Sequence, residues 1–311
     1  MPAFGVSKSI QIDAPVERVF EVVRDFKQWP NWSPWLICDP ETKLEFADDG
    51  NRYAWDGKIT GTGEIAVIGE TPLQEILYAL TFLKPWKSEA DVAFRFQSME
   101  GGTEVTWEMN SSLPFFMGWM KDKMTAMLCM DYQRGLTMLK DWVEMGSVPS
   151  TLDYSQRQHD AVRYVGLATT CEMANLGEAM EADVEKLAKV LEEASVEVNG
   201  SWFSIYETWD LGKGMAGYVM GAPVSELPTP IPDGLVSGIR PAARVYEVSH
   251  TGPYRHLGNA WSSGMMRGRY KVFAMNKKIP PYEIYETHPK DIGLEATSES
   301  EVKTTVCFPT K

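Results

Sequence analysis

The spacing of apolar residues predicts a series of strands followed by a long helix in the first half of the chain. Residues 43–112 alternate with a period of two in short stretches separated by Gly, Pro, Asp and Asn, which predicts an antiparallel meander of about six or seven strands. A strand over 5–12 and a helix over 16–26 precede this meander, and apolar residues at helical spacing follow it from Pro114 to Gly146. These elements form the first predicted domain, residues 1–146.

The second half of the chain repeats the order strand, helix, strand, strand. The first copy comprises strands at 162–170, 202–208 and 215–220 and a helix at 175–194; the second comprises strands at 244–250, 282–286 and 302–308 and a helix at 254–275. We expect the two copies to share one sheet and to leave a groove at the pseudo-twofold axis between them. Residues 161–311 form the second predicted domain, and the fold class is α+β.

Residues 147–160 separate the two patterns. Their sequence, Ser-Val-Pro-Ser-Thr-Leu-Asp-Tyr-Ser-Gln-Arg-Gln-His-Asp, is polar and follows neither periodicity, which is typical of an interdomain linker. A chain of 311 residues is also long enough for two domains of ordinary size. We therefore expect the two domains to be joined here.

The net charge and the positions of the cysteine and histidine residues restrict the partners, compartment and cofactors that we expect. A net charge of −13 repels phosphate backbones and anionic lipid surfaces, which argues against nucleic-acid and membrane partners. No run of roughly 18 apolar residues and no apolar segment of a signal peptide occur, so we expect a cytoplasmic protein. The four cysteines are scattered singly and the four histidines form no paired motif, so we expect no metal site and no cofactor.

The first domain resembles the START-like helix-grip (SRPBCC) superfamily of polyketide cyclases and lipid-binding proteins. The resemblance rests on the opening Ile-Asp-Ala-Pro-Val-Glu-Arg-Val-Phe at 12–20 and on the order of strand, short helices, meander and C-terminal helix. It implies a curved antiparallel sheet around the last helix, with a cavity between them. Trp29, Trp32 and Trp35 are expected to pack on the sheet, with a lid over the cavity mouth as the alternative.

The second domain resembles the GyrI-like family. The motifs are Ser-His-Thr-Gly-Pro-Tyr at 249–254 before a helix, and Pro-Tyr-Glu-Ile-Tyr at 281–285 followed by His-Pro at 288–289. The family includes effector-binding domains of AraC- and MerR-type multidrug regulators, gyrase-inhibitory proteins, and hydrolases of cyclopropane-bearing natural products. No helix-turn-helix is evident in the sequence, so the resemblance implies ligand binding without the DNA-binding output of the regulators.

The strand around Glu283 is the best candidate site. Alternate residues of a strand share a face, so Glu283 and Tyr285 point one way while Tyr282 and Ile284 point the other. Among aromatic rings, desolvation raises the pKa of a carboxyl group, whereas a bound cation favours its ionised form. Glu283 can therefore hold a cationic lipophilic ligand or act as a general acid or base, and the resemblance implies both roles. The alternative is a solvated charge at a strand end.

Aromatic side chains are the candidate walls of this site. The predicted ligand-binding set is Glu283, Tyr285, Tyr206, Trp261, Tyr254 and Phe273, with Trp209 and Tyr218 as further candidates. In a regular strand Tyr206 and Trp209 cannot share a face, and Tyr206 is preferred. Tyr254 and Trp261 lie two helical turns apart, so both can border the groove. The alternative for each ring is a place in the hydrophobic core.

Three functions are compatible with the sequence. The first is a cytoplasmic binding protein for hydrophobic small molecules, cationic ones included, with its main pocket in the GyrI-like domain. The second is a hydrolase of cyclopropane-bearing or other electrophilic xenobiotics, with Glu283 as the catalytic acid or base. The third is a regulator that binds a protein partner, as the gyrase-inhibitory members of the family do; an exposed apolar patch would favour it.

Overall fold

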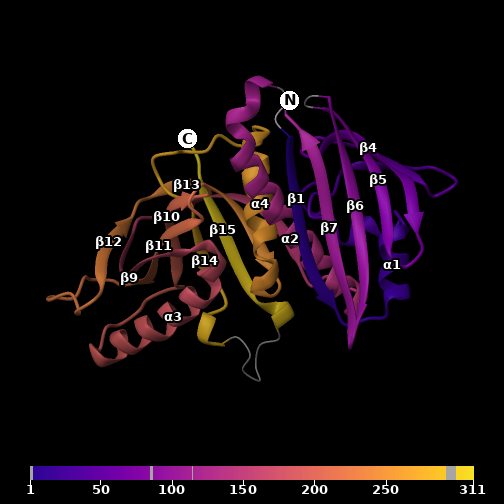
Figure 1. Ribbon diagram of the computed structural model, residues 1–311. Helices are drawn as coiled ribbons and strands as arrows, with labels where there is room; N and C mark the ends of the chain where they lie inside the picture. The colour runs from indigo at the N-terminus through magenta and orange to yellow at the C-terminus, as the bar shows by residue number, and fades with distance from the viewer. Residues whose placement is uncertain (1–2, 85–86, 114, 292–298) are drawn as a thin grey trace. The chain divides into compact units, whose positions relative to one another are not determined.

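The computed structural model describes residues 3–84, 87–113, 115–291 and 299–311. Contacts between residues divide the chain into two units, Met1–Pro149 and Ser150–Lys311, each with its own antiparallel sheet and helices (Figure 1). The predicted α+β class is confirmed.

The first unit places a seven-stranded antiparallel sheet against one long helix. The strands are β1 (Ala3–Ile12), β2 (Lys43–Phe46), β3 (Arg52–Gly57), β4 (Gly61–Thr71), β5 (Glu75–Lys84), β6 (Ser88–Met99) and β7 (Gly102–Ser112), in the order β1-β7-β6-β5-β4-β3-β2. The short helix α1 (Val16–Arg24) follows β1, and α2 (Lys121–Met145) closes the unit. Helix α2 ends at Gly146, whose left-handed φ of 73° suits a residue without a side chain. This is the predicted helix-grip order.

Aromatic rings fill the region between this sheet and α2. Trp107 of β7 stacks on Tyr132 of α2, with ring centroids 4.1 Å apart, and on Phe94 of β6 at 4.9 Å. Trp29 and Trp32 join the same core and are almost fully buried, as the packing interpretation predicted. The rings therefore hold the helix to the sheet.

The second unit contains an eight-stranded antiparallel sheet with two related halves. Its strands are β8 (Thr151–His159), β9 (Val162–Glu172), β10 (Phe203–Asp210), β11 (Met215–Pro223), β12 (Val236–Arg240), β13 (Ala243–Thr251), β14 (Tyr282–Tyr285) and β15 (Lys303–Pro309), in the order β12-β9-β11-β10-β14-β15-β13-β8. Helix α3 (Leu176–Glu193) follows β9, and α4 (Gly258–Arg269) follows β13. The halves meet where β10 pairs with β14, at the pseudo-twofold axis.

The segment predicted as a linker, residues 147–160, is a strand for most of its length. Strand β8 pairs with β13 over nine residues and forms one edge of the sheet. Strand β12 pairs with β9 and forms the other edge. The strand that precedes each half in the sequence therefore pairs with the other half. The linker interpretation was wrong because an edge strand with one solvated side needs few apolar residues: only Leu152 and Tyr154 of β8 pack on the core.

Both helices of the second unit cover the same face of its sheet. Helix α3 packs through Leu187 and Leu191 on one half, and α4 packs through Ala260 on the other. The second helix is shorter than predicted, because a 3-10 turn at Tyr254–His256 precedes it and it ends at Arg269. The opposite face carries a separate apolar cluster that includes Phe203.

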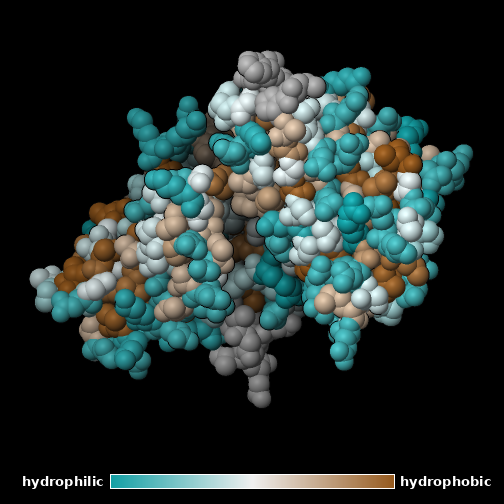
Figure 2. Space-filling model, viewed as in Figure 1, coloured by the Kyte–Doolittle hydropathy of each residue, from teal (hydrophilic) through white to brown (hydrophobic). Residues whose placement is uncertain are grey.

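The surface in view mixes residues of different hydropathy. Figure 2 shows hydrophilic side chains interspersed with smaller hydrophobic groups over each unit on this face. Among the described residues, none of the helices has both the length and the apolar character needed to cross a membrane.

Candidate functional site

Glu283 lies on β14 at the centre of the sheet, on the face that the helices cover. Ser204 of β10 is its direct partner across the strand pair. Both residues are buried, and the small Ser204 side chain leaves space above the strands for larger neighbours. The Tyr285 hydroxyl occupies this space, 2.8 Å from Ser204 Oγ and 2.9 Å from Glu283 Oε2.

The Glu283 carboxyl group is surrounded by neutral hydrogen-bond donors. The Trp261 indole N–H of α4 donates to Oε1 at 2.5 Å, and the Tyr285 hydroxyl donates to Oε2. The Tyr206 hydroxyl adds a further interaction with the carboxyl and lies 3.6 Å from Met180 Sδ. Burial raises the pKa of Tyr206 and of Tyr285 well above the ordinary value, so both phenols keep the proton that they donate.

The charge on Glu283 has no counterion within the part of the chain that the structure describes. Its side chain is 2% exposed, and no Lys, Arg or His of the described ranges forms an ion pair with it. Burial raises the pKa of Glu283 above its ordinary value, while the hydrogen bonds from Trp261, Tyr285 and Tyr206 oppose this shift. The site is therefore a buried carboxyl group with donors that favour its charged form but do not neutralise it.

Four of the predicted aromatic residues lie together around this carboxyl. The ring of Tyr206 meets the edge of Trp261 with centroids 4.9 Å apart. The ring of Tyr254 meets that of Tyr285 at 6.2 Å. Tyr206 and Tyr285 are buried, Trp261 is partly exposed and Tyr254 is 39% exposed, so the cluster extends from the carboxyl to the surface.

Trp209 lies beside the cluster, contrary to the expectation from a regular strand. The pairing of β10 with β11 skips Glu207: Tyr206 pairs with Tyr218, and Thr208 pairs with Gly217. This β-bulge inserts one extra residue and returns Trp209 to the face of Tyr206, with their rings 6.0 Å apart. Trp209 is 47% exposed and thus lies at the outer edge of the cluster.

Phe273 and Tyr218 have other neighbours. Phe273 lies beyond the end of α4 and stacks on Tyr246, with centroids 4.4 Å apart and planes at 12°, in the core cluster beneath α4. The structure does not bring Phe273 to Tyr206 and Tyr285. The Tyr218 hydroxyl donates to Asp183 Oδ2 on α3 at 2.8 Å, so its polar end is engaged away from Glu283.

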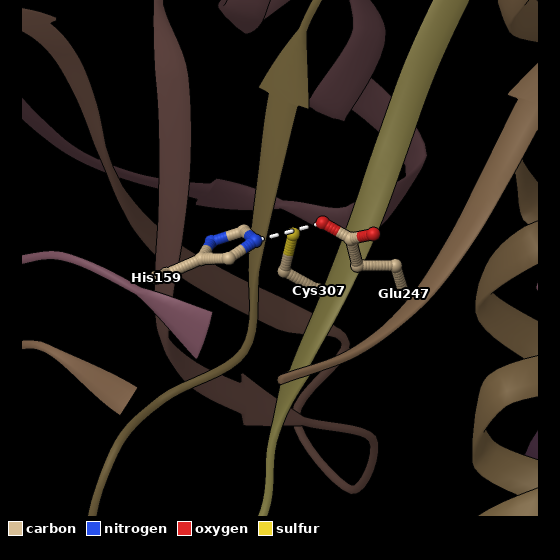
Figure 3. A group of neighbouring side chains, drawn as sticks. All are labelled: His159, Glu247 and Cys307. Carbon is tan, nitrogen blue, oxygen red and sulfur yellow. Dashed lines mark hydrogen bonds and ion pairs between the residues drawn. The ribbon is translucent and has the colours of Figure 1, made fainter. Parts of the chain in front are cut away.

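A second group of chemically active side chains lies on the opposite face of the sheet. His159, Glu247 and Cys307 come from β8, β13 and β15, and their side chains converge (Figure 3). Sequence reasoning missed this group, because the three residues are far apart along the chain and fall in no metal-binding motif. Only the pairing of the strands brings them together.

Residues 3–144 match a known family, the one described as polyketide cyclase / dehydrase and lipid transport. The match covers nearly the whole first unit and confirms the predicted resemblance of this unit to polyketide cyclases and lipid-binding proteins. A comparison with curated proteins found no match.

Solved structures of low sequence identity align with parts of this chain. A START superfamily protein from Mycobacterium smegmatis is 20% identical and aligns with 46% of this chain and 99% of its own, with a TM-score of 0.33. The C-terminal domain of EcmrR is 14% identical and aligns with 51% of this chain and 98% of its own, with a TM-score of 0.42. EcmrR in its complex with DNA is 13% identical and aligns with 61% of this chain and 68% of its own, with a TM-score of 0.44.

Proposed function

We propose that the second unit binds lipophilic organic cations of the cytoplasm, including xenobiotics, with Glu283 as the anionic anchor. The observation that carries the proposal is a buried carboxyl group with neutral donors and, among the described residues, no cationic partner. Burying an unpaired charge costs roughly several kcal/mol, because the charged group loses its hydration. A ligand cation offsets that cost, which selects for positively charged ligands.

The aromatic rings give the proposed site its preference for lipophilic ligands. The faces of Tyr and Trp attract cations and also cover apolar groups. Tyr206 and Trp261 lie close to the carboxyl, whereas Tyr254 and Trp209 lie towards the surface. A delocalised cation with aromatic substituents fits both parts of this arrangement.

Trp261 is the proposed gate to the carboxyl group. Of the donors to Glu283, Tyr206 and Tyr285 are buried, and Trp261 alone is partly exposed. A ligand therefore reaches the carboxyl most directly by displacing the indole ring. The lost N–H bond to Oε1 is then replaced by the ligand's charge, which favours cations over neutral analogues of the same shape.

The match of the first unit supports small-molecule binding as the general class of function. Its family description names lipid transport alongside polyketide cyclase activity. We place the main site in the second unit, because its carboxyl group and aromatic rings form a defined recognition element.

The proposal is tested by titrating the full chain with tetraphenylphosphonium and following tryptophan fluorescence. We expect Glu283→Gln to weaken binding by at least about tenfold, because the charge that pairs with the cation is lost. Glu286→Gln is the matched control, since it removes an exposed carboxylate three residues away. Equal affinities for wild type and Glu283→Gln, or equal losses in both variants, contradict the proposal. Neutral triphenylphosphine oxide is expected to bind more weakly than the cation.

One observation favours hydrolysis of electrophilic xenobiotics as the second candidate. The raised pKa of the buried Glu283 carboxyl, and its link through Tyr285 to Ser204, suit a group that exchanges a proton with a substrate. Incubation with a cyclopropane-bearing alkylator tests this function. Turnover by wild type and its loss in Glu283→Gln support hydrolysis, whereas no turnover of several such substrates removes it.

A further inference from the structure

Three neighbouring strands bring His159, Glu247 and Cys307 to one point. Cys307 of β15 lies directly opposite Glu247 of β13, and His159 lies at the end of the adjacent edge strand β8. One nitrogen, one carboxylate oxygen and the sulfur lie within 4.8 Å of one another. Figure 3 shows the imidazole and the carboxylate approaching each other beside the sulfur. Cys307 pairs with Tyr282, the residue before Glu283 on β14. Because side chains alternate along a strand, the cluster lies on the face of the sheet opposite to Glu283.

We propose that His159, Glu247 and Cys307 form a binding site for a zinc ion. Imidazole nitrogen, carboxylate oxygen and thiolate sulfur are the ligand types that zinc takes in proteins. Three protein ligands leave a fourth tetrahedral position for water or another group. The donor set does not suit magnesium or calcium, which take oxygen ligands.

The surroundings of His159 orient it as a metal ligand. Its Nδ1 lies 2.7 Å from the Tyr282 hydroxyl, and its Nε2 lies 2.7 Å from Glu247 Oε1. A hydrogen bond at one imidazole nitrogen is the usual way in which proteins hold the other nitrogen towards a metal. The ion takes a place between Nε2 and Oε1, while Nδ1–H donates to Tyr282.

Glu247 is held in a way that leaves one oxygen for the ion. Its Oε2 accepts a hydrogen bond from Ser155 and pairs with Arg157 Nε at 3.2 Å, whereas Oε1 faces His159. Cys307 is fully buried; its thiol makes a weak contact of 3.7 Å with the Thr305 carbonyl and also interacts with the Tyr282 hydroxyl. The sheet therefore fixes both ligands in place beside His159.

The charges balance on binding. Zinc binding releases the thiol proton of Cys307 to the solvent, and the neutral imidazole of His159 carries its single proton on Nδ1, which leaves Nε2 for the ion. The bound group is then a doubly charged cation with one thiolate, one carboxylate and a neutral imidazole, which is neutral overall. A buried site of this kind avoids the desolvation cost of a net charge.

A structural ion fits the burial of this group better than a catalytic thiol does. Cys307 is 0% exposed, so a substrate has no direct approach to its sulfur. Zinc would instead tie the edge strand β8, through His159, to the two strands beside it. This role is independent of ligand binding at Glu283.

Cobalt provides a direct probe, because a thiolate bound to Co²⁺ gives a charge-transfer band in the near ultraviolet. The full chain is reduced, freed of metal with a chelator and titrated with Co²⁺. We expect a charge-transfer band together with the strong visible bands of tetrahedral cobalt, and their loss on addition of Zn²⁺. Absence of the charge-transfer band in the wild-type protein overturns the proposal.

Matched variants assign the ligands. Cys307→Ser is expected to lose the charge-transfer band, whereas Cys171→Ser, which changes a partly buried cysteine of the same unit, keeps it. The opposite result overturns the assignment. If Cys307→Ser does not fold, Glu247→Gln provides the second test, with cobalt affinity reduced at least about tenfold as the expected result. Unchanged affinity in that variant contradicts the site. Zinc is also expected to raise the Tm of the wild type but not of Cys307→Ser.

Discussion

Ser204 and Glu283 face each other across the two central strands, and a single hydroxyl joins them. The Tyr285 oxygen lies within hydrogen-bond distance of both side chains. The Tyr285 hydroxyl is directed towards Ser204 Oγ and Glu283 Oε2, and the Ser204 hydroxyl donates to Met220 Sδ. Of its two acceptors the carboxylate is the stronger when it is charged, so the phenol proton then favours Glu283. This arrangement ties the stability of the central strand pair to the ionisation of one carboxyl group.

Removing the Tyr285 hydroxyl is expected to destabilise the second unit. In Tyr285→Phe the buried carboxylate loses a donor, and a hydrogen bond to a charged group contributes about 1.5–3 kcal/mol. The free energy of unfolding in urea measures the loss. Tyr270→Phe is the control, because no hydrogen bond of that hydroxyl occurs among the described residues. Similar losses in the two variants would show that the carboxylate does not depend on Tyr285.

The stability of the protein is expected to depend on pH through Glu283. Its folded pKa is raised above the ordinary value of 4.5, so the folded state binds more protons than the unfolded state between the two pKa values. The contribution of Glu283 is therefore fully present below the unfolded pKa and is lost as the pH rises through the folded pKa.

Glu283→Gln removes this dependence. Unfolding in urea at a series of pH values is expected to show the variant gaining stability relative to wild type as the pH rises above 4.5. In the same range, binding of a permanently charged cation to wild type is expected to strengthen as the carboxyl ionises. A stability difference that stays constant with pH contradicts the raised pKa.

The alternation of residues along the chain predicted most of the fold, because buried faces leave a periodic signal. The alternation of side chains along β14 predicted that Glu283 and Tyr285 share a face and that Tyr282 points to the other face, as the structure shows. An edge strand leaves a weaker signal, and β8 was missed although Leu152 and Tyr154 alternate within it. Its pairing with β13 depends on partners far along the chain: Thr151 pairs with Thr251, one hundred residues away.

The neighbours of the candidate site were predictable only in part. Tyr206 and Trp261 were expected near Glu283, but their contacts depend on how α4 lies on the sheet, which no local pattern encodes. The bulge at Glu207 places Trp209 on the face of the sheet opposite to the expected one, because one unpaired residue shifts the alternation of all later side chains in the strand. A bulge is set by the pairing of two strands and is not visible in one of them.

The corrected position of Trp209 makes it a test of the site's outer edge. Trp209→Ala is expected to weaken tetraphenylphosphonium binding about two- to fivefold, the contribution of one cation–π contact at an exposed position. Stability is expected to change little, because the side chain is 47% exposed. Trp119→Ala is the control: that tryptophan is 82% exposed and belongs to the first unit. Binding that is unchanged in Trp209→Ala would place the ligand elsewhere.

Gly264 controls how closely α4 approaches the sheet, and therefore where Trp261 lies. A Cβ atom at this position would overlap the Phe308 ring of β15, so only glycine allows the observed spacing. Trp261 lies one helical turn earlier and touches the same ring, with centroids 5.5 Å apart. Gly264→Ala is expected to push the helix outwards, to cost about 1–3 kcal/mol in the free energy of unfolding, and to weaken cation binding.

Gly177→Ala separates this packing effect from helix propensity. Gly177 lies on α3, and a Cβ there meets no atom within 4 Å, so alanine is expected to stabilise the protein by up to about 1 kcal/mol and to leave binding unchanged. Urea unfolding and the tetraphenylphosphonium titration measure both variants. If Gly264→Ala gains stability as Gly177→Ala does, the contact between α4 and β15 is not tight. The position of Trp261 over Glu283 must then have another cause.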